Sequence, residues 1–430
     1  MNKKFFRPML HIIAASVFFS PLAGCSPLKD RKEKEKPEPP RQVVMWKFKS
    51  NKEDYMIYDW VKQWNSSNRD IQVEFELIPY NDYLTNKLPT AFATNSAPDV
   101  YMISAGGFMK YAKAGCMQPL DEYMDDSLKK DFYEQSLNAA MYDGKIIGLP
   151  IEREPVALFY NKNRLTGKGV NPPANWDELE DSVKKLNSDG MTGINLPWQP
   201  NDYQNFIFYS FLMQAGGVID GETGTSKFKT SGLKALKLWR TLSKYNYKSE
   251  ATIQLPSDIY PLASGKTSMQ VCGYWAVKML ERYYPDFEYG AIPIPGPADG
   301  IDTSVYGGWF QVVNPNRKNV DAAAQFTVWM WGKETVRPLQ WCTEASSKFP
   351  ARKSVVAGSQ EKAFSSPVSE MFKTRILPNA IPEPRYPVEM SNIVSRSIQE
   401  AMFTDKSIED IANSADKEIN QYLKANGLVF

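Results

Sequence analysis

Two carboxylates that lie close together in the sequence, Glu152 and Glu154, come nearest to a catalytic pattern. Paired carboxylates cleave glycosidic bonds when they flank the bond. Arg153 lies between them on a segment that we expect to be extended, and we expect the two carboxylates to point to opposite sides. This expectation disfavours a glycosidase pair and favours one carboxylate that faces a ligand beside one surface charge.

Histidine is almost missing from the chain. The one histidine, His11, falls in an N-terminal segment that we expect to be removed. A mature protein without histidine has no Ser-His-Asp triad or Cys-His dyad, and it offers no imidazole ligands to zinc. We therefore expect no catalytic residue, no metal site and no cofactor.

Aromatic side chains are plentiful, with 11 Trp and 22 Tyr. Most of them belong to hydrophobic cores, but rings beside turn-forming glycines and prolines are candidates for ligand contacts because loops carry them. Flat rings of this kind stack on the apolar faces of sugars, and we expect at least two to face a ligand. The candidates are Trp198, Trp275, Trp309 and Tyr386, and we add Tyr203 to the predicted ligand-binding residues.

Residues 1–24 are typical of a signal peptide. A basic stretch precedes an apolar run at residues 9–20, which is shorter than the roughly 20 residues needed to cross a bilayer as a helix. Leu22–Cys25 matches the bacterial lipobox, in which the thiol is lipidated and becomes the new N-terminus. The alternative is an ordinary signal peptide with a chance cysteine nearby. We predict that residues 25–41, which are charged and rich in proline, form a flexible tether.

The charges of the chain nearly cancel. There are 51 basic and 49 acidic residues, and removal of Lys3, Lys4 and Arg7 with the signal peptide leaves 48 basic residues against 49 acidic ones. No basic excess remains to neutralise phosphates, so we expect no nucleic-acid partner. The 43% hydrophobic content predicts an ordered chain with ample core.

Three cysteines remain after Cys25 is lipidated, namely Cys116, Cys272 and Cys342. An odd number cannot pair completely within one chain. We expect small buried thiols, and one disulfide is the alternative.

From residue 42 the hydrophobic pattern alternates between strands and helices. Strands are predicted at 42–46, 71–77 and 98–104, with helices around 57–64 and 82–92 between them. This order implies right-handed crossovers and a largely parallel sheet, whose ligands lie beyond the carboxyl ends of the strands. The loops at those ends, 49–51 and 104–107, make Asn51 and Ser104 ligand candidates.

A second α/β block follows residue 145. Asn175 is predicted to cap a helix, with Glu178 at the third helical position as in a capping box. The remaining predictions are extended chain at 146–150 and 155–160, strands at 268–272 and 289–294, a helix at 320–331, and closing helices at 388–425.

Several short segments, taken in order, resemble the extracellular solute-binding proteins of carbohydrate ABC importers, the class that includes the maltose-binding protein. The resemblance covers about residues 42–425. The segments that carry it are Leu22–Cys25, Ala97–Val100, Tyr142–Pro150, Leu158–Lys162, Asn175–Glu178, Ala215–Gly217, Gly265–Met269, Gly273–Trp275 and Gly307–Gly308.

The resemblance implies two α/β lobes joined by a hinge, with the ligand between them. The N-terminal lobe would comprise 42–152 and 305–345, and the C-terminal lobe 153–304 and 346–430. It also implies a monomeric, lipid-anchored receptor on the outer face of the cell membrane, which captures a sugar or oligosaccharide by hinge closure and delivers it to the permease subunits of an ABC importer.

Three residues carry over from the family one at a time. Glu154 matches a cleft carboxylate, Trp275 matches a stacking tryptophan, and Tyr386 lies where the family has another aromatic residue. The chain departs from the maltose binder after Asp99, where Ser104–Gly107 replaces a loop with a stacking Trp and a hydrogen-bonding Asp. The resemblance therefore does not imply maltodextrin specificity.

Two other functions stay open from the sequence. One is a surface-anchored glycosidase that uses Glu152, Glu154 or other carboxylates. The other is the same fold with a non-sugar solute, such as a peptide or a polyamine. Many clustered acids in the cleft would indicate a polyamine, and the predicted cleft loops contain few.

Overall fold

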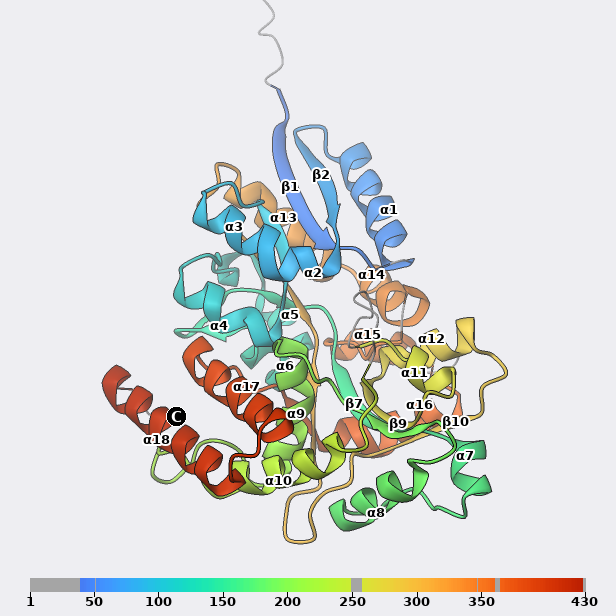
Figure 1. Cartoon of the computed structure of the whole chain (residues 1–430). Coiled ribbons are helices and arrows are strands. Elements are labelled where there is room, and N and C mark those ends of the chain that lie inside the picture. The colour runs from blue at the N-terminus through green and yellow to red at the C-terminus, as the bar shows by residue number, and fades with distance from the viewer. Residues whose placement is uncertain (1–38, 51, 249–256, 346, 360–363, 428–430) are drawn as a thin grey trace, which may run out of the picture. The chain divides into compact units, whose positions relative to one another are not determined.

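The computed structural model describes residues 39–50, 52–248, 257–345, 347–359 and 364–427 (Figure 1). The described residues from Pro40 onward form one compact unit. The predicted signal peptide, Cys25 and most of the predicted tether lie outside the described residues. In the part of the chain that is described, no helix combines the length and the apolar character that a membrane span requires.

The first sheet has five strands in the order β2-β1-β3-β12-β6. Its central strands are parallel, as predicted, because β1 pairs in parallel with both β2 and β3. The fourth strand, β12, is antiparallel to β3 and to β6. The strands are β1 (Arg41–Phe48), β2 (Ile71–Ile78), β3 (Val100–Ser104), β6 (Leu149–Pro150) and β12 (Trp309–Val313).

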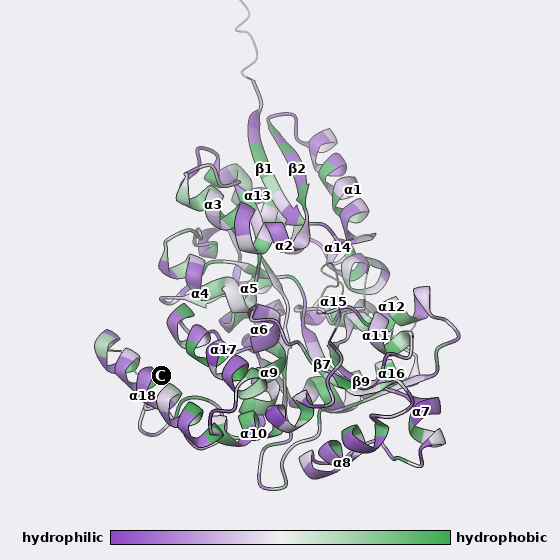
Figure 2. Ribbon diagram, in the orientation of Figure 1, coloured by the Kyte–Doolittle hydropathy of each residue, from purple (hydrophilic) through white to green (hydrophobic). Residues whose placement is uncertain are grey.

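Helices around this sheet follow the predicted apolar spacing. In α1 (Lys52–Ser67) the stripe Ile57, Trp60, Val61 and Trp64 is buried. Figure 2 shows the resulting two-sided colouring of α1. The predicted helix at 82–92 is continuous, although its middle turn has π-helical hydrogen bonds. Its parts are α2 (Tyr80–Asp82), the π-helix Tyr83–Lys87 and α3 (Leu88–Ala93).

One predicted loop of the first sheet is wrong. Residues 104–107 do not form a loop, because α4 (Ala105–Lys113) begins directly after β3. The Ser104 hydroxyl accepts a hydrogen bond from the Gly107 amide at 3.3 Å and so caps the helix. The end of β3 therefore presents a helix N-terminus, with two glycines in its first turn.

The second sheet has the order β13-β11-β7-β9-β8, and β10 also pairs with β7. Most of its pairings are antiparallel, because only β8 with β9 and β11 with β13 run parallel among the described strands. The strands are β7 (Glu154–Asn161), β8 (Thr192–Asn195), β9 (Thr267–Gly273), β10 (Tyr289–Ile292), β11 (Ser304–Gly307) and β13 (Ala380–Pro382).

Asn175 caps α8 as predicted. Its Oδ1 atom accepts from the Glu178 amide at 2.9 Å, and Glu178 accepts in return from the Ala174 amide. The helices around the second sheet include α7 (Lys162–Gly167), α8 (Trp176–Leu186), α9 (Asp202–Gln214), α10 (Ser231–Ser243), α11 (Tyr260–Ala263), α12 (Trp275–Tyr283), α16 (Pro367–Met371), α17 (Val388–Phe403) and α18 (Ile408–Asn426).

The remaining elements of the described residues vary in length. They are α5 (Asp126–Asp131), α6 (Glu134–Asn138), β4 (Met141–Tyr142), β5 (Lys145–Ile146), α13 (Val320–Trp331), α14 (Val336–Gln340) and α15 (Lys353–Ser359), with π-helices at Trp341–Ala345 and Phe372–Ile376 and 3-10 turns at Asp121–Tyr123 and Leu377–Asn379. The predicted helix at 320–331 is confirmed by α13.

The hydrophobic cores follow the two sheets. One core draws on residues 43–151 and 309–351, and two others draw on residues 156–423. Cys116, Cys272 and Cys342 are buried free thiols, as predicted. Each sheet thus has its own core, built from stretches of chain that are far apart in the sequence.

The chain passes between the sheets at three segments that bond to one another. The Ile151 amide donates to the Trp309 carbonyl at 3.0 Å, and the Arg153 amide donates to the Phe349 carbonyl. Gly308 has φ +143°, and a β-carbon there would lie 2.7 Å from the Glu152 carbonyl oxygen. Only glycine fits this crossing, because a side chain would collide with the neighbouring backbone.

Candidate ligand-binding site

The structure places Trp309 and Ser104 opposite each other on β12 and β3 of the first sheet. The Trp309 ring packs against Phe48 at a centroid distance of 4.2 Å and against Tyr80 at 6.3 Å. Trp309 is 8% exposed. These residues form an aromatic group at the carboxyl ends of the parallel strands, where the sequence predicted ligands.

A second aromatic group lies at the second sheet. Trp275, the first residue of α12, lies 6.2 Å from the Tyr203 ring and 6.5 Å from Phe206, both on α9. Its indole nitrogen donates to the Ser257 carbonyl at 3.2 Å. A β-carbon on Gly273 would lie 1.6 Å from the Trp275 ring, so Gly273 leaves the space that the indole occupies. The structure thus brings Tyr203 and Trp275 together.

Glu154, the first residue of β7, lies in a buried charge cluster around Lys348. The Lys348 ammonium is 3.0 Å from Glu154, 3.0 Å from Glu152 and 3.2 Å from Glu53 of α1. The expectation that Glu152 and Glu154 point to opposite sides was wrong. Residues two apart on an extended chain line the same side, and here both reach one lysine.

Negative charge exceeds positive charge in this cluster, and the titration of its members reflects that. Burial, opposed by the Lys348 ammonium and assisted by the negative charges of Glu154 and Glu53, raises the pKa of Glu152 to about 8. Burial also raises the pKa of Glu154. The carboxylates raise the pKa of Lys348 although burial opposes this, so Lys348 stays charged.

A second buried lysine extends the cluster along the first sheet. The Lys47 ammonium lies 2.9 Å from Asp54 and 3.4 Å from Glu53, and it donates to the Ser50 hydroxyl. Glu53 therefore contacts both buried ammonium groups, and the cluster connects β1 and α1 to the start of β7. Sequence reasoning missed Lys47 and Lys348, since neither lies in a motif.

Further acidic residues meet at the N-terminus of α4. A β-carbon on Gly106 would lie 3.2 Å from Glu383 Oε1 and 3.6 Å from Asp202 Cγ. Asp202 begins α9, and Glu383 directly follows β13. Sequence reasoning missed both residues, because the close approach of α4 to α9 and to the end of β13 is a tertiary contact.

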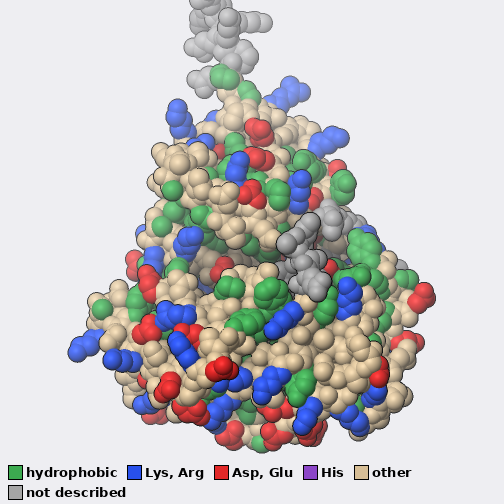
Figure 3. Space-filling model, viewed as in Figure 1, with side chains coloured by type: hydrophobic (Ala, Val, Ile, Leu, Met, Phe, Trp, Pro, Cys, Tyr) green, Lys and Arg blue, Asp and Glu red, His purple; other side chains and the backbone are tan. Residues whose placement is uncertain are grey.

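Tyr80 connects these groups. Its ring packs against Trp309, and burial together with the negative charges of Glu154 and Asp202 raises the pKa of its hydroxyl. Burial is the main cause that raises the pKa of the Tyr203 hydroxyl, and electrostatic interactions with Tyr80 and Glu154 also raise it. Trp309, Tyr80, Glu154, Tyr203 and Asp202 thus surround one region between the sheets. Figure 3 shows a hollow in the surface between the part that carries α2 and α3 and the part that carries α9 and α17.

Two predicted ligand residues, Tyr386 and Trp198, are not brought to this region by the contacts described, and a third cannot be placed. The Tyr386 ring packs edge-on against Tyr209 at 5.6 Å, beside the core of the second sheet. Trp198 is half-buried, and its carbonyl accepts a hydrogen bond from Gln399 at 3.0 Å. Asn51 lies outside the described residues.

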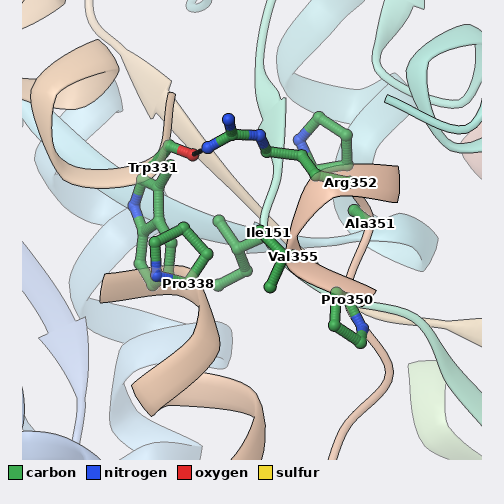
Figure 4. A pocket seen from close by; sticks show the side chains of 8 residues that line it. Ile151, Trp331, Pro338, Pro350, Ala351, Arg352 and Val355 are labelled. Atoms are coloured by element: carbon green, nitrogen blue, oxygen red, sulfur yellow. Dashed lines mark hydrogen bonds between the residues drawn. The ribbon is translucent and has the colours of Figure 1, made fainter. Parts of the chain in front are cut away.

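A small pocket elsewhere is unsuited to a polar ligand. It is lined mostly by proline and apolar side chains, among them Trp331, Pro338 and Val355 (Figure 4). Its charged member, Arg352, already donates to the carbonyls of Trp331 and Glu334 at 2.9 Å each. The region between the sheets is therefore the better candidate site. Within the described residues no acidic, cysteine or histidine group is arranged to hold a metal ion.

Comparisons with known proteins identify relatives of the chain. A binding protein of Brucella abortus is 28% identical over 372 residues, which cover 83% of this chain and 87% of the relative. The maltotriose-binding protein of Pyrococcus abyssi is 27% identical over 303 residues, covering 67% of this chain and 62% of the relative.

Solved structures of solute-binding proteins share the fold. One from Thermotoga lettingae, bound with α-D-tagatose, has a TM-score of 0.76 at 23% identity and covers 89% of this chain and 100% of its own. This likeness confirms the predicted two-lobed α/β fold. A profile of the family described as bacterial extracellular solute-binding protein matches residues 59–368. The chain therefore belongs to the bacterial extracellular solute-binding protein family.

Proposed function

We propose that the protein is the receptor of a bacterial ABC importer and that it binds a sugar or oligosaccharide between its two sheets. The observation that carries this proposal is the meeting of aromatic rings and carboxylates from both sheets, with Trp309 and Tyr80 on one side and Tyr203, Trp275 and Glu154 on the other. Rings stack on the apolar faces of sugars while carboxylates accept hydrogen bonds from hydroxyls. The sugar ligands of the relatives support the same class of solute.

Hinge closure is the proposed mechanism. Contacts such as Gly106 with Glu383 and Glu53 with Lys348 join elements of the first sheet to segments beside the second. A ligand between the two sides contacts both of them only when they approach each other. Binding therefore shifts the population towards the closed form. The permease would then recognise that form and pass the sugar on.

The lobe boundaries belong to this proposal. We assign residues 42–152 and 305–345 to the N-terminal lobe, and 153–304 and 346–430 to the C-terminal lobe. The distribution of the hydrophobic cores supports this division. The Ile151 to Trp309 and Arg153 to Phe349 hydrogen bonds would lie in the hinge.

Attachment to the membrane completes the proposal. The family acts outside the cytoplasm, and the lipobox Leu22–Cys25 supports a lipid anchor on that face of the membrane. Residues 25–41 would tether a monomeric receptor within reach of the permease. We propose no catalysis, because the family is one of binding proteins and Glu152 is buried against Lys348 and Trp341.

A thermal-shift screen of the purified protein against neutral and charged mono- and oligosaccharides tests this function. A ligand at 100 times its Kd adds about 2.7 kcal/mol to the stability of the folded state, which is readily measured as a rise in Tm. The bound sugar should be recovered chemically unchanged. Absence of a shift with every sugar, or release of hydrolysed sugar above background, would contradict the proposal.

A further inference from the structure

Glu383 is a buried carboxylate without a bonding partner. It is 7% exposed, and among the described residues no side-chain hydrogen bond or ion pair involves its carboxylate. Its oxygens point at two glycines, since β-carbons on Gly106 and Gly307 would lie 3.2 Å from Oε1 and 3.5 Å from Oε2. An ionised carboxylate in this position is costly unless it is paired, so a cation bound beside Glu383 would favour its charged form.

Asp202 lies beside Glu383, and both side chains lie close to Gly106. The Asp202 Cβ and Cγ atoms lie 3.4 and 3.6 Å from the Gly106 β-carbon position. The Asp202 side chain is accessible to solvent, and desolvation by the surrounding protein raises its pKa. Both features fit a side chain that lines an open hollow. Burial raises the pKa of Glu383 well above its usual range, and the Asp202 charge adds to the shift.

Little positive charge faces this pair in the described part of the chain. Lys110 of α4 is the cation that lowers the pKa of Asp202, and no cation counters the shift at Glu383. The Lys348 ammonium is already shared by three carboxylates. Carboxyl groups therefore outnumber cations among the described residues of this region, and a cationic group on a ligand would stabilise the ionised form of Glu383 and Asp202.

The acidic pair adjoins the aromatic group of the proposed sugar site. A β-carbon added at Gly307 would face Glu383 and would also lie 2.8 Å from the Phe206 ring. Phe206 in turn stacks against Trp275. A sugar ring held by the aromatic group would thus place a substituent close to Glu383 and Asp202.

We propose that Glu383 and Asp202 form a subsite for a protonated amine, so that the ligand is an amino sugar or an oligosaccharide that contains one. This inference rests on the proposed function and adds the charge of the ligand to it. An ammonium group donates up to three hydrogen bonds, which match carboxylate acceptors, and charge-assisted bonds of this kind are the strong ones. A neutral hydroxyl could bond to the same oxygens but would leave their charge uncompensated.

Calorimetry on the full-length protein with matched sugars tests the inference. The members of each pair share a skeleton and differ by one amine for hydroxyl replacement per sugar ring: glucosamine with glucose, galactosamine with galactose, mannosamine with mannose, and the disaccharides of glucosamine with those of glucose. N-acetylated forms supply a third member without charge. We expect at least one amine form to bind about 10-fold to 100-fold more tightly than its hydroxyl and acetylated partners.

Variants show whether the acidic pair causes the preference. Glu383→Gln and Asp202→Asn keep the shape of the side chains, and each should reduce the preference for the amine about 10-fold or more while changing the affinity for neutral partners much less. Asp202 is exposed, so its variant tests the subsite even if Glu383→Gln fails to fold. Glu222→Gln, an exposed residue of the turn after Asp220, makes the same charge change elsewhere and should leave the preference unaltered.

The outcomes separate this inference from the proposed function. Binding of a neutral sugar with no preference for any amine would overturn the amine subsite and leave the sugar receptor intact. An amine preference that both variants retain would also overturn it, since the cation would then bind elsewhere. Failure of every sugar, charged or neutral, would overturn the sugar receptor and the subsite together.

Discussion

The Lys348 ammonium lies 3.0 Å from Oε1 of Glu154, and this ion pair fixes a predicted ligand-facing carboxylate from a segment almost 200 residues away. The same ammonium contacts Glu53 on α1, so one side chain joins the first sheet to the first strand of the second. Lys348 is 4% exposed, and its pairs are therefore little screened by solvent.

We expect Lys348→Met to destabilise the protein by about 3–5 kcal/mol, because three carboxylates would lose their shared cation inside the protein. The measurement is the shift of the urea denaturation midpoint at pH 8. Lys373→Met is the matched control: Lys373 pairs with Glu370 on the surface, where such pairs contribute about 0–1 kcal/mol. Equal losses in the two variants would contradict a structural role of the cluster.

The stability of the protein should fall as the pH rises from about 4.5 to about 8. Burial raises the pKa of Glu152 from 4.5 to about 8, so in this range the folded state holds a proton that the unfolded state has released. Stability falls with pH wherever the folded state binds more protons. The raised pKa of Lys348 acts only above the ordinary lysine range and does not alter this sign.

Melting temperatures between pH 5 and pH 8.5 check this dependence. Glu152→Gln has no carboxyl to titrate, so its melting temperature should decline less across the range and exceed that of the wild type at pH 8.5. Glu222→Gln, on the surface, should reproduce the wild-type slope. A slope in Glu152→Gln as steep as in the wild type would assign the titration to other groups.

Local signals in the sequence predicted many helices and strands but not the tertiary contacts between them. The stripe of Ile57, Trp60, Val61 and Trp64 and the cap at Asn175 act within a few residues, and both are confirmed. Helix α9 was not predicted, because it is buried on nearly all sides and its apolar residues show no single face.

The charged part of the candidate site could not be predicted for a similar physical reason. Glu154 and Trp275 stand beside recognisable motifs, and the structure brings both of them to Tyr203. Lys348 and Glu383 owe their roles to contacts with residues far away in the sequence, and neither has a neighbour that marks it. The pairing of charges in a fold depends on tertiary packing, and sequence rules for hydrophobic alternation and helix capping do not predict tertiary packing.

Cys25→Ala should release the protein from the membrane fraction or leave it unprocessed. The lipobox Leu22–Cys25 motivates this prediction, since the thiol is the atom that would carry the lipid. Incorporation of labelled fatty acid and membrane fractionation provide the measurements. Cys116→Ala is the control, because its thiol is buried in the folded protein. Equal labelling of the wild type and Cys25→Ala would show that no lipid is attached at this residue.

Gly106→Ala should weaken sugar binding while the ligand-free protein melts at the same temperature or slightly higher. The added methyl group would lie 3.2 Å from Glu383, which belongs to the other side of the proposed cleft, so it obstructs closure. Overpacking of this kind costs about 1–3 kcal/mol, or about 5-fold to 150-fold in affinity. Alanine also favours helix over glycine by up to about 1 kcal/mol, which supports α4 itself.

Gly167→Ala is the matched control for Gly106→Ala. Gly167 ends α7, and a β-carbon there meets no atom within 4 Å. Calorimetric affinity for the tightest sugar of the screen should therefore stay at the wild-type value. If Gly106→Ala also binds at the wild-type value, α4 does not approach Glu383 in the ligand-bound form.

Trp275→Ala tests whether the second aromatic group holds the ligand. Trp275 is half-buried, and its ring packs on Tyr203 and Phe206 at the start of α12. Base stacking on aromatic side chains is worth about 1–3 kcal/mol, and by analogy the loss of this ring should weaken sugar binding about 5-fold to 150-fold. A ring at the wall of an open hollow supports the fold less than a core ring does, so the melting temperature of the ligand-free variant should change little.

Trp239→Ala provides the comparison, because Trp239 is fully buried in the core of the second sheet. Truncation of a core tryptophan costs about 3–5 kcal/mol of stability, which lowers the melting temperature by many degrees. Affinity and ligand-free melting, measured on both variants, separate the two roles. A large fall in the melting temperature of Trp275→Ala with unchanged affinity would make Trp275 a core residue, and the sugar would then have to be held by Trp309, Tyr80 and the carboxylates alone.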